Sequence, residues 1–180
     1  MYKRQTVLVE ALALARQSTP FPLQLKIIGP PDPRYPEADQ RIEALGLGDT
    51  VMRVGYQSSS DLIRAYQTAD AIVLPSRYEG FGFPVVEGMA CGTPVICSDI
   101  PVLREIGGEA AYYTDLGNPS ALADGIRAVL NTPELQNRMI TLGLDQALKF
   151  TWTAAARKTI ALYRELAGST QSPDKGNPAS

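Results

Sequence analysis

Apolar residues recur along the first two-thirds of the chain in two alternating patterns, which predict helices and short strands in turn. Residues 6–17 place Leu8, Leu12 and Ala15 at helical spacing behind Thr6, a residue able to cap a helix. Residues 23–28 form a short apolar run that ends at a glycine, which is typical of a buried strand. The same reasoning predicts three further helices: over about 37–45, from the cap residues 58–61 onward, and over 84–90. It also predicts further strands over 50–54, 71–74, 94–97 and 110–113.

The last third of the chain is predicted to be helical as far as residue 167. Helices are expected to start at Asn118-Pro119, at Thr132-Pro133 and at Thr151, each with apolar residues along one face. From Gly168 onward the residues are mostly Ser, Pro, Gly, Asn and Lys, so we expect a disordered tail over 168–180. Residues 30–36 hold four prolines in seven positions and are predicted to form a loop.

This alternation predicts an α/β fold: a Rossmann-like parallel sheet with helices on both faces. The chain has 180 residues, enough for one domain of ordinary size, which we assign to residues 1–167. In such sheets ligands bind outside the carboxyl ends of the strands. The loops that follow the predicted strands are therefore the places to search for function.

Composition narrows the function classes. The chain has 17 Lys and Arg against 19 Asp and Glu, a net charge of −2, so no general attraction to nucleic acid or acidic lipid is expected. It contains no histidine, which excludes a Ser-His-Asp triad built from this chain alone. No apolar run approaches the roughly 20 residues of a membrane helix, and the first residues do not form a signal peptide, so a cytoplasmic location is expected.

Candidate chemistry concentrates in residues 76–96, which follow a predicted strand, turn on glycines and open a helix. Glycines let the backbone approach a ligand closely, and a helix start offers unpaired N–H groups with partial positive charge. Together they predict a diphosphate site that needs no metal ion. Glu79 and Glu87 bracket the turn, and carboxylates accept hydrogen bonds from the hydroxyls of sugars and ribose.

The run E-G-F-G-F-P-V-V-E-G-M-A-C-G-T-P-V-I, from Glu79 to Ile96, resembles the E-x7-E motif region of retaining glycosyltransferases of family 4, the group 1 glycosyltransferases with GT-B architecture. Shorter matches are Ile28-Gly29-Pro30, Arg53-Val54-Gly55, and the segments at 98–101, 115–119 and 150–152. The resemblance covers about residues 2–167.

The resemblance implies a role for each matching residue. Glu79 would bind hydroxyls of the donor sugar as the catalytic-centre carboxylate, and Glu87 would hold the ribose hydroxyls. Lys3 would bind the diphosphate, and Arg53 would lie near the base. The backbone of the intervening turn would face the sugar and diphosphate, through Gly80, Phe81, Gly82, Phe83 and Pro84.

The resemblance also implies parts that this sequence lacks. We expect that the acceptor-binding N-terminal domain is absent, and so is the first strand of the C-terminal domain, which would lie between the strands at 23–28 and 71–74. The last helix, 152–166, is expected to dock toward the absent domain. We therefore expect the chain alone to be poorly stable and inactive, with any peripheral membrane association supplied only by the missing domain.

The leading hypothesis is the donor-binding half of a retaining glycosyltransferase. Its donor would be GDP-mannose or a UDP-sugar, its acceptor a sugar, lipid or glycan that the sequence does not specify, and no metal or other cofactor is expected. Two alternatives stay open: a nucleotide-sugar epimerase of the same architecture, and a non-catalytic fragment.

Overall fold

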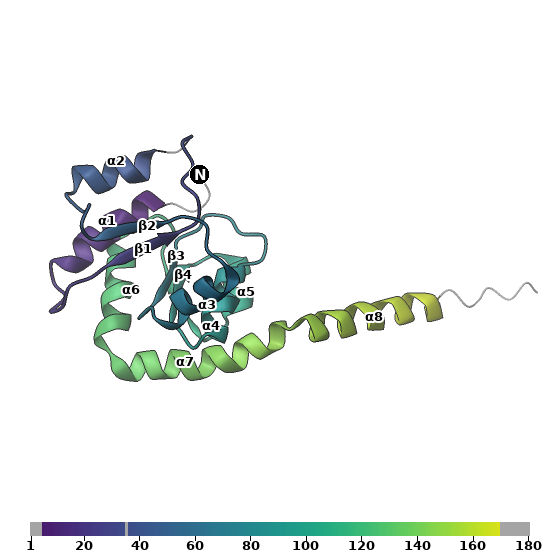
Figure 1. Ribbon diagram of the computed structural model, residues 1–180. Helices are drawn as coiled ribbons and strands as arrows, with labels where there is room; N and C mark the ends of the chain where they lie inside the picture. Colours follow the sequence, from purple (N-terminus) through teal and green to yellow (C-terminus); the bar gives the residue numbers. More distant parts are fainter. Residues whose placement is uncertain (1–4, 35, 170–180) are drawn as a thin grey trace, which may run out of the picture. The chain divides into compact units, whose positions relative to one another are not determined.

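The computed structural model describes residues 5–34 and 36–169, and side chains as far as Ala167. The chain divides into two compact units, Met1–Ala147 and Leu148–Ser180. Figure 1 shows the course of the chain. The first unit contains seven helices within its described part: α1 (Gln5–Arg16), α2 (Glu37–Ala44), α3 (Ser59–Gln67), α4 (Phe83–Ala90), α5 (Pro101–Gly107), α6 (Pro119–Asn131) and α7 (Pro133–Ala147).

The strands of the first unit are short and parallel, as the sequence predicts. They are β1 (Leu25–Ile28), β2 (Val51–Val54), β3 (Ile72–Leu74), β4 (Val95–Ser98) and β5 (Ala111–Thr114). Strands β1 and β2 form one sheet, and β3, β4 and β5 form another with β4 in the centre. Among the described residues, β1 and β3 each pair on one side only.

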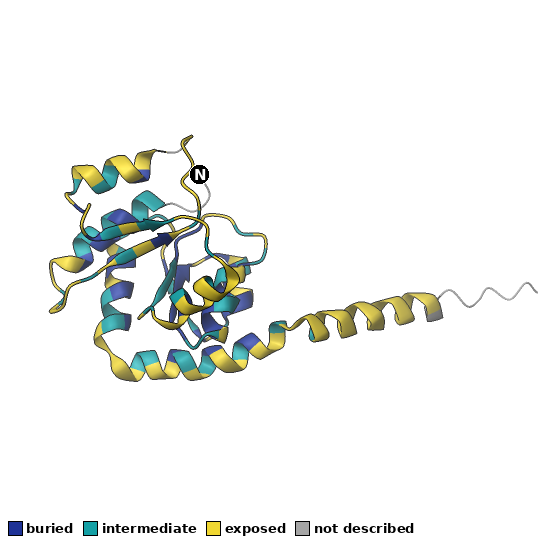
Figure 2. Ribbon diagram, viewed as in Figure 1, coloured by how far each residue is buried: buried dark blue, intermediate teal, exposed yellow. Residues whose placement is uncertain are grey.

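Helices cover both faces of the three-stranded sheet. Val73, Ile96 and Tyr112 are in register on neighbouring strands, and they pack in the core cluster that α1 and α6 supply. The neighbouring positions Ile72 and Val95 lie on the other face, beneath Gly88 of α4. All four residues of β4 are buried, because the strand is central and covered on both sides (Figure 2).

Helix α1 contributes to two hydrophobic clusters among the described residues of the first unit. Leu8 and Ala11 pack in the cluster with α6, whereas Val9 and Leu12 pack with Leu47 and side chains of β1 and β2. The apolar residues that identify α1 in the sequence are therefore shared between two faces of the helix.

The second unit begins with the short 3-10 helix η1 (Leu148–Phe150) and continues as α8 (Trp152–Ser169). The predicted start at Thr151 is confirmed, because the Thr151 hydroxyl oxygen accepts a hydrogen bond from the Ala154 N–H at 3.1 Å. Helix α8 extends to Ser169, beyond the predicted end. The rest of the expected tail, 170–180, lies outside the described residues.

Two details of the helix predictions need correction. Thr6 does not cap the first helix, because α1 already includes Gln5 and Thr6 lies within its first turn. Helix α5 was not predicted: its seven residues carry only two buried large apolar side chains, Leu103 and Ile106, so periodicity alone does not reveal it. It opens on Pro101, which suits a first helical turn.

Candidate functional site

The turn between β3 and α4 follows the carboxyl end of a buried strand. Gly82 is the N-cap of α4 and has φ +96°, in the left-handed region that glycine adopts readily. The residue is buried, and a Cβ at this position would lie 2.8 Å from Leu103 Cδ2. Both the backbone conformation and the available space therefore require glycine here.

Helix α4 starts without a side-chain cap. Gly82 has no side chain to accept hydrogen bonds from the first-turn N–H groups, and Pro84 lies in the first turn, where its missing N–H does no harm. Since α4 has eight residues, its N-terminus carries the partial positive charge of a helix start. This end of the helix suits an anionic group that approaches from the turn.

Glu79 lies in that turn, and a serine side chain orients its carboxylate. The hydroxyl of Ser76, which is fully buried just after β3, donates a hydrogen bond of 2.6 Å to Glu79 Oε1. The Glu79 residue itself is half-buried. The serine fixes one carboxylate oxygen and leaves the other able to accept from a ligand hydroxyl.

Glu87 lies in the second turn of α4 and has a comparable partner from another helix. The hydroxyl of Tyr66, near the end of α3, donates a hydrogen bond of 2.8 Å to Glu87 Oε2. Burial, followed by this hydrogen bond, raises the pKa of Tyr66 above its ordinary value, so the phenol stays protonated and remains a donor. Glu79 and Glu87 are thus both half-buried carboxylates in one strand–turn–helix segment, each oriented by a hydroxyl.

The two phenylalanines of the turn form an aromatic pair. The ring centroids of Phe81 and Phe83 are 4.8 Å apart, with an interplanar angle of 45°. Phe83 is 55% exposed, whereas Phe81 is half-buried. The pair stiffens the turn, and Phe83 leaves an apolar surface at the start of α4.

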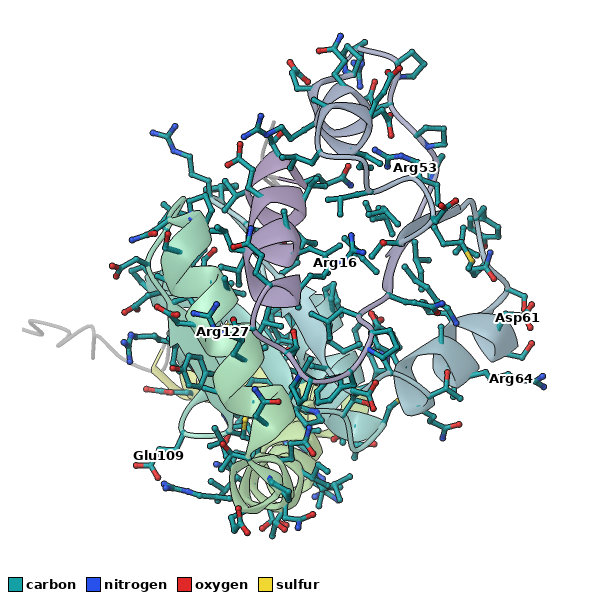
Figure 3. All side chains as sticks on the ribbon, turned by 90° about the vertical axis from the view of Figure 1, so that its left-hand side faces the viewer. Arg16, Arg53, Asp61, Arg64, Glu109 and Arg127 are labelled. Atoms are coloured by element: carbon teal, nitrogen blue, oxygen red, sulfur yellow. The ribbon has the colours of Figure 1, made fainter. Side chains whose placement is uncertain are left out.

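Two further residues, Lys3 and Arg53, were predicted to belong to the site. Lys3 is outside the described residues. Arg53 belongs to β2, in the two-stranded sheet, where its Nε forms an ion pair with Asp39 of α2 and a terminal nitrogen donates to Gln5 Oε1 at 3.4 Å. Figure 3 shows Arg53 beside α2. No contact among these joins Arg53 to Glu79 or Glu87, so its role near a base stays a prediction.

Sequence reasoning missed the two hydroxyl residues of the site. Ser76 stands three residues before Glu79, so its proximity was visible in the sequence, but its burial and orientation were not. Tyr66 is 21 residues from Glu87, and helical periodicity marks it only as a core position. Its contact with Glu87 depends on how α3 packs against α4.

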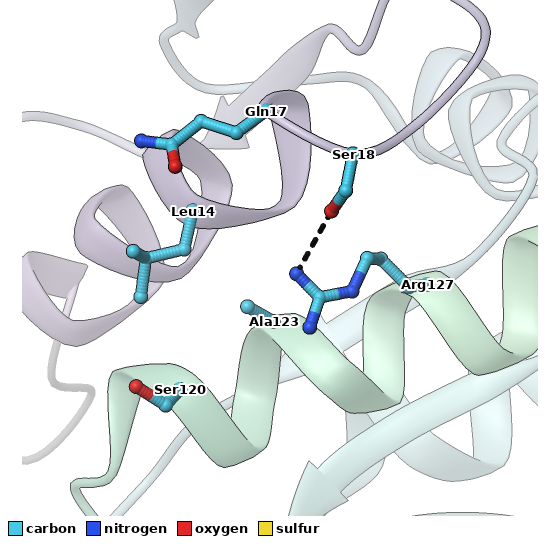
Figure 4. Close-up of a pocket in the computed structure, with 6 residues that line it drawn as sticks. All are labelled: Leu14, Gln17, Ser18, Ser120, Ala123 and Arg127. Carbon is cyan, nitrogen blue, oxygen red and sulfur yellow. Dashed lines mark hydrogen bonds between the residues drawn. The ribbon is translucent and has the colours of Figure 1, made fainter.

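Two hollows on the first unit lie away from these carboxylates. One, of about 340 Å³, is lined by residues of α1 and α6 and of the residues just after α1, and Arg127 there donates to the Ser18 hydroxyl at 3.1 Å (Figure 4). The other, of about 370 Å³, is lined by Ala13, Arg16, Gln17, Leu45 and Leu47. Neither contains a predicted site residue.

The described residues contain no group of three or more His, Cys, Asp or Glu side chains that could hold a metal ion. Among the helices in the part of the chain that the structure describes, none is both long enough and apolar enough to cross a membrane.

The carboxylate pair, the glycine turn and the parallel fold match a known family. A family description for group 1 glycosyl transferases matches residues 1–145. This chain belongs to the group 1 glycosyltransferases. The assignment confirms the family that the E-x7-E region resembles.

Individual relatives agree with this family assignment. The chain is 36% identical over 113 residues to O-antigen chain mannosyltransferase B of Escherichia coli, covering 63% of this chain and 30% of that protein. It is 32% identical over 175 residues to phosphatidyl-myo-inositol mannosyltransferase of Mycobacterium tuberculosis, covering 93% and 45%. The chain therefore spans less than half the length of these relatives.

A solved structure agrees with the fold. Sucrose-phosphate synthase from Thermosynechococcus elongatus superimposes with a TM-score of 0.76 at 30% sequence identity, covering 94% of this chain and 44% of that one. The predicted fold class, an α/β domain of the GT-B type with parallel strands flanked by helices, is confirmed.

Proposed function

We propose that this domain binds a nucleotide-diphosphate sugar and serves as the donor half of a retaining glycosyltransferase. The observation that carries the proposal is the segment from Ser76 to Glu87: an uncapped helix start behind a left-handed glycine, bracketed by two oriented carboxylates. Membership of the group 1 glycosyltransferases supports the reaction class.

Each part of the segment has a task in this proposal. The backbone of residues 80–83 and the start of α4 face the diphosphate, Glu79 accepts hydrogen bonds from the donor sugar, and Glu87 accepts them from ribose. When the glycosidic bond to the nucleotide breaks, negative charge grows on the diphosphate. Fixed N–H donors and a helix dipole aimed at that charge contribute several kcal/mol.

Basic residues complete the proposed site. Lys3 neutralises the leaving diphosphate and Arg53 contacts the base, in keeping with the family resemblance. No metal ion takes part in this scheme, because the helix start and the lysine carry the positive charge. The donor is GDP-mannose or a UDP-sugar, and the similarity to two proteins named as mannosyltransferases favours mannose as the transferred sugar.

Calorimetric titration of the 180-residue chain with GDP, UDP and ADP tests the proposal. We expect one nucleotide to bind, with an affinity that EDTA does not change. Glu87→Ala is expected to weaken binding by about 10-fold to 100-fold, the range for a lost charge-assisted hydrogen bond. Glu109→Ala is the matched control, since Glu109 is exposed and precedes the amino end of β5, opposite the site.

A second arm of the same titration addresses Glu79. If this carboxylate holds the donor sugar, Glu79→Gln weakens binding of the nucleotide sugar and leaves the affinity for the bare nucleoside diphosphate nearly unchanged. Equal loss for both ligands would contradict the assigned role. No binding of any nucleotide to the folded wild-type chain would overturn the proposal as a whole.

A further inference from the structure

Tyr66 is held by two hydrogen bonds, one at its side chain and one at its backbone, so the position of its hydroxyl is well defined. Its residue is 9% exposed, and its hydroxyl donates to Glu87 Oε2 at 2.8 Å. Its backbone carbonyl accepts a hydrogen bond of 2.7 Å from the hydroxyl of Thr93, a residue that is itself 3% exposed. The end of α3 is thereby tied to the loop before β4, and the phenol is tied to α4.

Glu87 needs such a partner if it is to bind a ligand specifically. A glutamate side chain has several rotatable bonds, and the loss of this conformational freedom opposes binding unless the side chain is already ordered. The tyrosine hydroxyl has one proton to donate, so it occupies one acceptor position on Oε2 and leaves Oε1 without a hydrogen bond from Tyr66. A carboxylate held in this way suits two neighbouring hydroxyl groups.

We propose that Tyr66 is a positioning residue, whose hydroxyl holds the Glu87 carboxylate in the orientation that accepts hydrogen bonds from the 2′- and 3′-hydroxyls of a nucleotide ribose. The inference rests on the proposed function, because it assigns to Glu87 a ribose of a bound nucleoside diphosphate. It adds that helix α3, which lies outside the glycine-turn segment, determines how well the site distinguishes ribose from deoxyribose.

Discrimination between sugars provides the test, because a merely structural role for Tyr66 would not change it. The probes are UDP and GDP and their 2′,3′-dideoxy counterparts, titrated into the 180-residue chain. The wild type is expected to prefer the ribonucleotide by about 10-fold or more. Tyr66→Phe keeps the ring and removes the hydroxyl, and it is expected to reduce this preference several-fold.

Two further variants make the result specific. In Glu87→Gln the preference is already small, and adding Tyr66→Phe to it should change the preference little, since both act on one contact. Tyr113→Phe is the matched control. The Tyr113 hydroxyl donates to the Gly108 carbonyl oxygen at 2.8 Å, so this variant also loses a hydrogen bond but should retain the full preference for ribose.

The outcomes separate the two proposals. If Tyr66→Phe weakens the ribonucleotide and the dideoxynucleotide equally, or weakens neither, Tyr66 does not position Glu87 for ribose, and the nucleotide site itself stands. If the wild type binds both sugars equally well, Glu87 does not contact ribose and the inference fails. If the folded wild type binds no nucleotide, the proposed function and this inference are both overturned.

Discussion

At the scale of single residues, the site depends on conformations that few side chains permit. Gly82 has positive φ and a buried position beside Leu103, and Ser76 is fully buried beneath Glu79. Each of these residues acts on a neighbour and need not meet the ligand. Substitutions here are therefore expected to alter the conformation of the turn itself.

Gly82→Ala is expected to destabilise the fold by about 1–3 kcal/mol. An alanine at φ +96° is strained, and its Cβ would meet Leu103 Cδ2 at 2.8 Å. Urea unfolding measures the change. Gly80→Ala is the control, since a Cβ there meets nothing within 4 Å, and it should shift the free energy of unfolding by less than about 1 kcal/mol. Equal stability of the two variants would refute this account of the turn.

At the scale of elements, helix starts and close helix–sheet contacts set the positions of α4 and α6. A Cβ on Gly88 of α4 would lie 3.1 Å from side-chain atoms of Ile72 and Val95, and a Cβ on Gly125 of α6 would lie 2.9 Å from Thr114 and Tyr112. Glycines therefore let one helix approach each face of the three-stranded sheet closely. The start of α4 is held beside β3 by this packing.

The start of α6 offers a measurable prediction. Asn118 is its N-cap, and its side-chain oxygen accepts hydrogen bonds of 3.1 Å from the N–H groups of Ser120 and Ala121. Asn118→Ala should lower the free energy of unfolding by about 1 kcal/mol, because both N–H groups lose their partner. Asn118→Asp keeps an acceptor and should stay close to the wild type. Thermal or urea unfolding measures the two free energies. Equal values for Asn118→Ala and Asn118→Asp would show that Asn118 does not stabilise the helix as its N-cap.

At the scale of the whole molecule, a cysteine thiol and two tyrosine phenols in the first unit link its stability to pH. Burial, and then the charge of Asp99, raise the pKa of Cys97 from 9.0 to about 12. Burial is also the largest cause that raises the pKa of Tyr113 from 10.0 to about 12, and the pKa of Tyr66 moves in the same direction. In each case the folded protein retains a proton that the unfolded chain releases.

This linkage predicts alkaline destabilisation. Below pH 9 both states hold these protons and stability is complete; between about pH 9 and 12 the unfolded chain loses them first, so the free energy of unfolding falls. Each retained proton contributes a slope of up to roughly 1.4 kcal/mol per pH unit. Urea unfolding from pH 8 to 10.5 should show a smaller slope for Cys97→Ala than for the wild type. Parallel slopes would show that Cys97 is not involved.

Local patterns in the sequence determined most of the elements and the segment that carries the candidate site. Periodicity and cap residues act within one or two turns, so they place most helices and all five strands to within a few residues of the observed bounds. The glycine turn and its two glutamates are also local, since they share one strand–turn–helix segment. The physical reason is that backbone conformation and helix capping depend on near neighbours.

Only the tertiary structure decided which side chains from distant elements meet. Tyr66 reaches Glu87 across 21 positions, and Arg53 pairs with Asp39 across 14, because α3 packs on α4 and α2 lies beside β2. Helix α5 likewise has only seven residues, too few to show a helical period in the sequence. Its apolar side chains are buried by packing against other elements. Such contacts depend on how whole elements pack. Packing involves many residues from separate parts of the sequence, so no local pattern predicts it.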